Sequence, residues 1–167
     1  MNKNIIKIIK TIDTLKLNIE VLGKCISFFL IHKELDRSKL IQFYSENQSS
    51  YFMILMMIDS ISIDLKKSFT GPLDTLLQIE KIQALIWKLK IEFRNYMESS
   101  LSTGFSDAIY HKKMELIKLY GQLSTTSNEL DLMTKRELDL MTKRAEKQSL
   151  EINQLKNNRN EGLNSDD

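Results

Sequence analysis

Isoleucine and leucine recur near the start of the chain at alternating spacings of three and four residues. The row consists of Ile5, Ile8, Ile12, Leu15, Ile19, Leu22, Ile26 and Phe29. This spacing is typical of a seam along which one helix packs against others with a left-handed twist. It predicts a helix over about residues 4–33. Such a helix would be roughly 45 Å long at 1.5 Å per residue, so it needs equally long neighbours.

Later rows of apolar residues predict those neighbours. A second helical stretch follows Asp36, a candidate N-cap, and ends at Gly71-Pro72, where the third helix begins. The polar run 45–50 predicts a kink or short break, because its side chains compete for backbone hydrogen bonds. A fourth helix follows the connection 99–106 and weakens near residues 124–127. Connections this short predict up-down-up-down packing.

A fifth helix is predicted from Thr126, because Thr126 and Glu129 have the spacing of a capping box. It contains a tandem octad, Glu-Leu-Asp-Leu-Met-Thr-Lys-Arg, at 129–136 and again at 137–144. Asp131 with Lys135, and their counterparts in the second copy, are predicted helix ion pairs. Eight residues at 100° each rotate the second copy by about 80°, so a straight helix cannot keep both copies on one packed face. We therefore expect the repeat to be exposed.

The patterns together predict an all-α protein, an antiparallel bundle of four to five long helices with a C-terminal helical or coiled tail. Residues 1–125 form the predicted bundle domain, and residues 126–156 form an exposed C-terminal helix with the tandem octad. The polar end, residues 157–167, is expected to be disordered.

Composition limits the environment and the partners. The 167 residues include 24 basic and 22 acidic side chains, a net charge of +2, which gives no strong field of one sign. The single cysteine, Cys25, forms no internal disulfide, which fits a reducing compartment and favours a cytoplasmic location. The opening residues are interpreted as helix rather than as a signal peptide. The longest uncharged run, 47–58, is too short to cross a bilayer, so no transmembrane segment is predicted.

No catalytic, cofactor-binding or metal-binding motif stands out, and the sequence predicts a protein that is not an enzyme. Asp107, His111 and Glu115 lie four residues apart on one helix face, and His32 with Asp36 has the same spacing. Bundle di-metal sites use Glu-x-x-His motifs on paired helices, which are missing here, so solvated charge pairs are favoured. Cys25 lies beside the first row and is interpreted as a small buried apolar residue.

Two surfaces are candidates for binding a partner. Trp87 shares one side of its helix with Gln83, Lys90 and Arg94. Packing against a second neighbouring helix is the favoured interpretation of Trp87, with docking of a partner as the alternative. The first helix is basic and offers a second candidate through Lys3, Lys7 and Lys10. The methionines Met53, Met56 and Met57 are expected to fill gaps in the core.

The expected function follows from the lack of a catalytic, cofactor-binding or metal-binding motif and from the surplus of apolar surface. We expect a helical protein-interaction module, acting as an adaptor, chaperone or inhibitor (of the immunity or antitoxin type) of a protein partner. Homo-oligomer formation is a further possibility. The alternative is a small helical nucleic-acid-binding subunit of a nucleoprotein complex. It would use the lysines of the first helix together with the Trp87, Lys90 and Arg94 side, although nucleic acid is not the favoured partner.

Overall fold

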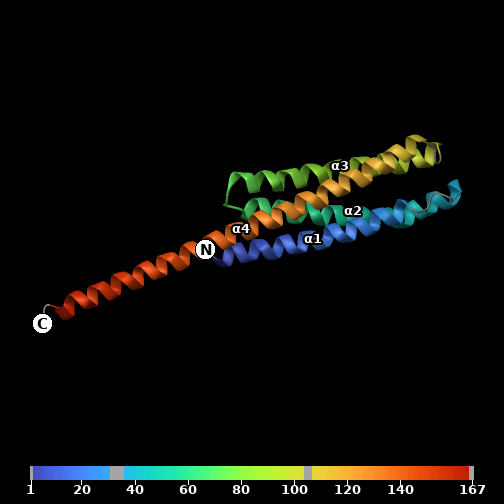
Figure 1. Ribbon diagram of the computed structural model, residues 1–167. Coiled ribbons are helices and arrows are strands. Elements are labelled where there is room, and N and C mark those ends of the chain that lie inside the picture. The colour runs from blue at the N-terminus through green and yellow to red at the C-terminus, as the bar shows by residue number, and fades with distance from the viewer. Residues whose placement is uncertain (1, 31–35, 104–106, 166–167) are drawn as a thin grey trace.

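The computed structural model describes residues 2–30, 36–103 and 107–165, and nearly all of these residues are helical. Helix α1 spans Asn2–Leu30, α2 spans Arg37–Ser68, α3 spans Leu73–Thr103 and α4 spans Asp107–Ser165. Figure 1 shows the four helices side by side, with α4 continuing well past the end of the other three. The predicted all-α class is confirmed.

Each helix packs against two of the others. Helices α1 and α3 each pack side by side with α2 and α4. Within the described ranges α1 and α3 do not pack side by side, nor do α2 and α4, although Phe29 of α1 reaches Phe93 of α3 across the core. Residues that contact each other follow opposite orders along α2 and α3. Near the start of α2 the Tyr44 hydroxyl lies 2.8 Å from the Ser100 hydroxyl, and near its end Lys66 forms an ion pair with Glu80. The helices therefore enclose one core between four faces.

The core is one continuous cluster of apolar side chains from all four helices. The row predicted in α1 is buried from Ile8 to Phe29, which confirms the seam. Near the end of α1, aromatic rings meet from three helices. The Tyr51 and Phe93 rings stack with centroids 3.5 Å apart, and the Phe29 and Phe93 rings lie nearly perpendicular with centroids 4.8 Å apart. These aromatic contacts tie α1, α2 and α3 together.

Two local sequence signals were expected to determine where helix α2 begins and where it is interrupted. Asp36 is its N-cap, as predicted, and its carboxylate accepts a hydrogen bond of 2.8 Å from the Lys39 backbone N–H. The kink predicted at 45–50 is wrong, because α2 is continuous to Ser68. Tyr44 and Tyr51 lie two turns apart, one on each side of this run, and both are buried on the core face. Their burial outweighs the weak helix propensity between them.

The predicted fifth helix is wrong for a similar reason. Helix α4 runs without interruption through residues 124–127. Thr126 does not cap a new helix, because its hydroxyl donates to the Gln122 carbonyl oxygen at 2.7 Å, and that of Ser127 donates to Ser124 at 2.9 Å. The polar side chains are thus satisfied inside one helix and can be buried against α1 and α3.

The boundary expected at residue 126, between the bundle domain and an exposed C-terminal helix, lies inside the packed bundle. Leu130, Asp131 and Thr134 in the first octad are buried, whereas the corresponding residues of the second octad are partly or fully exposed. This difference fits the 80° rotation between the copies. Residues 157–165, expected to be disordered, are helical, and the described side chains from Thr142 onward are exposed. Helix α4 therefore has a packed half and an extension that contacts no other helix.

Candidate partner-binding face

Trp87 lies on the outer surface of α3. The core face of this helix is formed by Ile79, Ile82, Ile86, Leu89 and Phe93, all of which are buried. Trp87 follows Ile86 and lies at the outer edge of the contact with α2, so that 63% of its surface is exposed. The packing favoured from the sequence is wrong, because neither neighbour of α3 covers most of this side chain.

Met56 of α2 extends this apolar surface. Met53, Met56 and Met57 are all exposed, so the expectation that they fill core gaps is wrong. Met56, Asp59 and Trp87 line the same hollow of about 60 Å³ between α2 and α3. We call the surface formed by Phe52, Met56, Trp87, Lys90 and Arg94 the Trp87 face. It combines an exposed tryptophan with a flexible thioether side chain.

Two cations lie over aromatic rings of the Trp87 face. The Lys90 ammonium nitrogen is 5.7 Å from the centroid of the Trp87 ring. The guanidinium carbon of Arg94 is 5.9 Å from the centroid of the Phe52 ring. Both distances are within the range of cation–π attraction. The face therefore presents positive charge directly beside apolar surface.

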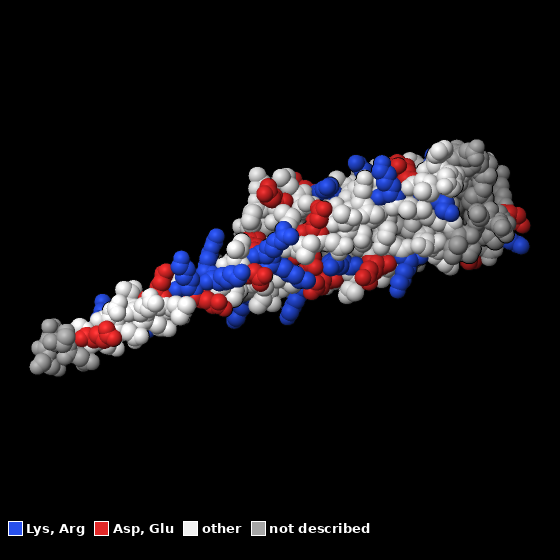
Figure 2. Space-filling view, viewed as in Figure 1, with Lys and Arg blue, Asp and Glu red and all other residues white. Residues whose placement is uncertain are grey.

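The lysines of α1 lie elsewhere. Lys3, Lys7 and Lys10 are exposed at the start of α1, and α1 does not pack side by side with the described part of α3. Figure 2 shows that charged side chains of both signs gather where α4 leaves the bundle. The structure therefore places Lys90 beside Trp87 and Arg94 beside Phe52, but it does not bring the three lysines of α1 to the same face.

The candidates for chemistry do not form a cluster. His111 and Glu115 are both exposed, while His32 and the side chain of Asp107 lie outside the described residues. In the described ranges no three His, Cys, Asp or Glu side chains are close enough to hold a metal ion. Cys25 is partly buried against the core, and this burial raises the pKa of its thiol, which disfavours the reactive thiolate.

A buried ion cluster between α1 and α4 was missed by the sequence reasoning. The Oδ2 atom of Asp131 lies 3.1 Å from the Lys16 Nζ atom and 3.1 Å from the Lys135 Nζ atom. The pair with Lys135 was predicted from its spacing, but Lys16 is 115 residues away and gives no local signal. Burial raises the pKa of Asp131, but hydrogen bonds and charge from the two lysines outweigh it, so the pKa is lowered overall.

The lowered pKa makes a prediction about acid stability. The unfolded chain binds a proton at Asp131 more readily than the folded chain does, so stability rises with pH in the acid range. The contribution is complete above the usual pKa of 3.8 and is lost as the pH falls through the lower folded value. Asp131→Asn is expected to cost about 1–2 kcal/mol at neutral pH and to flatten the acid dependence. Urea unfolding at several pH values, with the exposed Asp139→Asn as control, measures this; identical acid profiles for both variants would contradict it.

Comparison with protein-family models, with curated proteins and with solved structures gives no match. Among the described residues, no helix combines the length and the apolar character needed to cross a membrane.

Proposed function

We propose that the protein is a non-enzymatic helical interaction module that binds a protein partner through the Trp87 face, as an adaptor, chaperone or inhibitor. The observation that carries this proposal is the exposure of Trp87 beside Met56 and Lys90, with Arg94 over the Phe52 ring. Tryptophan and arginine are enriched among residues that dominate binding energy at interfaces. Exposed methionines adapt to different partner shapes. The partner surface would combine apolar side chains with carboxylates.

The antiparallel arrangement of the bundle is part of the proposal, and it accounts for the opposite order of contacts along α2 and α3. It fixes the Trp87 face on two long helices whose other sides are held in the core. A rigid platform of this kind loses little conformational entropy when it binds. A cytoplasmic location is included on the basis of the single, partly buried cysteine.

Binding of single-stranded nucleic acid is the alternative, favoured by the cation–π pairs, since bases stack on such aromatic side chains. It is less well supported, because the lysines of α1 do not lie near Trp87 and the net charge is only +2. Phosphate contacts would make binding fall steeply with salt, whereas an apolar interface would change little.

The experiment is a pull-down from native lysate with the tagged full chain at low and moderate salt, with and without nuclease. The wild type is compared with Trp87→Ala and with Leu77→Ala, a control exposed on α3 ten residues away. We expect a stoichiometric protein that survives salt and nuclease, is lost with Trp87→Ala and is retained with Leu77→Ala. Equal capture by both variants, or recovery of nucleic acid alone, would contradict the proposal.

A further inference from the structure

One row of side chains on α4 passes from the core into solvent. The row has alternating spacings of four and three residues and consists of Ser127, Asp131, Thr134, Leu138, Met141, Ala145, Gln148, Ile152 and Leu155. The first three members are buried, the next two are partly buried, and the last four are exposed. We call it the α4 row. The side of α4 that packs in the bundle thus continues along the extension without a neighbour.

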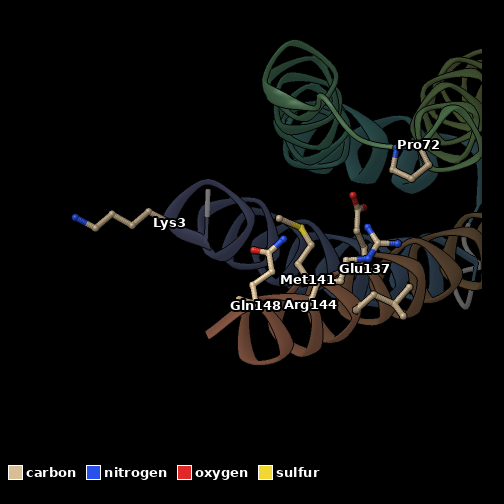
Figure 3. Close-up of a pocket in the computed structure, with 8 residues that line it drawn as sticks. Lys3, Pro72, Glu137, Met141, Arg144 and Gln148 are labelled. Atoms are coloured by element: carbon tan, nitrogen blue, oxygen red, sulfur yellow. The ribbon is translucent and has the colours of Figure 1, made fainter. Parts of the chain in front are cut away.

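A groove opens where the α4 row leaves the bundle. It has a volume of about 900 Å³ and is lined by Lys3, Pro72, Glu137, Leu140, Met141, Arg144, Ala145 and Gln148. Figure 3 shows Glu137 and Met141 pointing from α4 toward the side of Pro72, while Lys3 points away. The groove exists because α3 begins at Leu73, only five residues before Gln78, which bonds to Glu129 of α4 at 3.2 Å. Beyond about residue 134, α4 has lost its α3 neighbour.

We propose that the α4 extension of a second copy of this chain fills this groove, so that two extensions pack in opposite directions in a symmetric dimer. In this alignment Leu138 meets Leu155 of the second copy, Met141 meets Ile152, and Ala145 meets Gln148. Symmetry repeats each contact, so six layers cover the row from residue 138 to residue 155. The groove is then occupied by the far end of the other extension.

The charges beside the row match this alignment. Arg144 and Glu151 lie on the same flank of the row, seven residues apart. When the extensions run in opposite directions, Arg144 of each copy faces Glu151 of the other, which gives two ion pairs. Parallel extensions would place Arg144 beside Ser149 instead.

The extension also has a physical reason to associate. Most of the stability of a helix in a protein comes from packing of its apolar side rather than from helix propensity. Ile152 and Leu155 are exposed in the single chain, and pairing would bury both. This inference does not depend on the Trp87 face, which lies on other helices, so each proposal can fail without the other.

The first test is the mass of the full-length chain in solution, measured by light scattering and sedimentation from low micromolar to near-millimolar concentration. The wild type is expected to form a dimer, and Ile152→Asp with Leu155→Asp is expected to leave it monomeric. Leu150→Asp is the matched control, because Leu150 is 63% exposed, close to the 68% of Leu155, but lies off the row. A monomeric wild type at every concentration, or equal effects of Leu150→Asp and of the double variant Ile152→Asp, Leu155→Asp, would overturn the proposal.

The second test reverses the charges. Arg144→Glu alone and Glu151→Arg alone each replace two attractive pairs by two repulsive ones, and each is expected to raise the dissociation constant of the dimer about tenfold. The double variant Arg144→Glu, Glu151→Arg restores two attractive pairs and should recover the wild-type constant. Circular dichroism checks that all three variants remain equally helical. A double variant as weak as the single ones would overturn the antiparallel pairing.

Discussion

Phe93→Ala is expected to lower the free energy of unfolding by about 3–5 kcal/mol, as removal of a fully buried aromatic ring does. The Phe93 ring stacks on Tyr51 of α2 and lies nearly perpendicular to the Phe29 ring of α1, so its loss leaves a cavity where three helices meet. Urea unfolding, followed by the helical signal in circular dichroism, measures the change in the free energy of unfolding.

Phe28→Ala is the control for this variant. Phe28 is nearly half exposed, although its ring still packs against Phe43 with centroids 5.2 Å apart. Its replacement is expected to cost only about 1 kcal/mol. Similar losses in the two variants would mean that the aromatic contacts around Phe93 do not form the centre of the core.

Leu130→Ala is expected to cost about 2–4 kcal/mol, whereas Leu138→Ala is expected to cost about 1 kcal/mol or less. The two leucines occupy the same position in the tandem octad, so their local sequence is identical through the repeat. Leu130 is fully buried against the bundle, whereas Leu138 is only partly buried where α4 leaves it. The difference in cost therefore reports burial alone.

The measurement is urea unfolding at a protein concentration low enough to keep the chain monomeric, so that association does not contribute to the stability of the extension. Equal losses at the two positions would contradict the division of α4 into a packed half and an exposed extension. A larger loss for Leu138→Ala would place the end of the bundle beyond the second octad.

The helices were predictable from sequence because their apolar rows have a helical period over many turns. The row from Ile8 to Phe29 is buried as predicted. Helix ends and breaks were less predictable where local propensity competes with burial. The run 45–50 has weak propensity, but Tyr44 and Tyr51 on either side are anchored in the core, and no local pattern reports that anchoring.

The candidate site was predictable only in part. Helical spacing places Trp87, Lys90 and Arg94 on one side of α3. In the structure Lys90 lies over the Trp87 ring and Arg94 over the Phe52 ring of α2. Whether that side is covered depends on how many helices pack against α3. The apolar pattern of α3 alone does not predict how many there are. The contact between Lys16 and Asp131 joins residues 115 positions apart in the sequence, so no local pattern predicts it.

The central claim is that Trp87 is exposed in the free protein and is covered by a protein partner. Because Trp87 is the only tryptophan, its fluorescence reports this residue alone. The most direct measurement is acrylamide quenching of this fluorescence in the full-length chain, with and without the captured partner, using a partner fragment that lacks tryptophan. The account predicts strong quenching and red-shifted emission in the free chain, and a blue shift with reduced quenching in the complex. Emission already blue-shifted and protected in the free chain, or quenching unchanged by the partner, would contradict it.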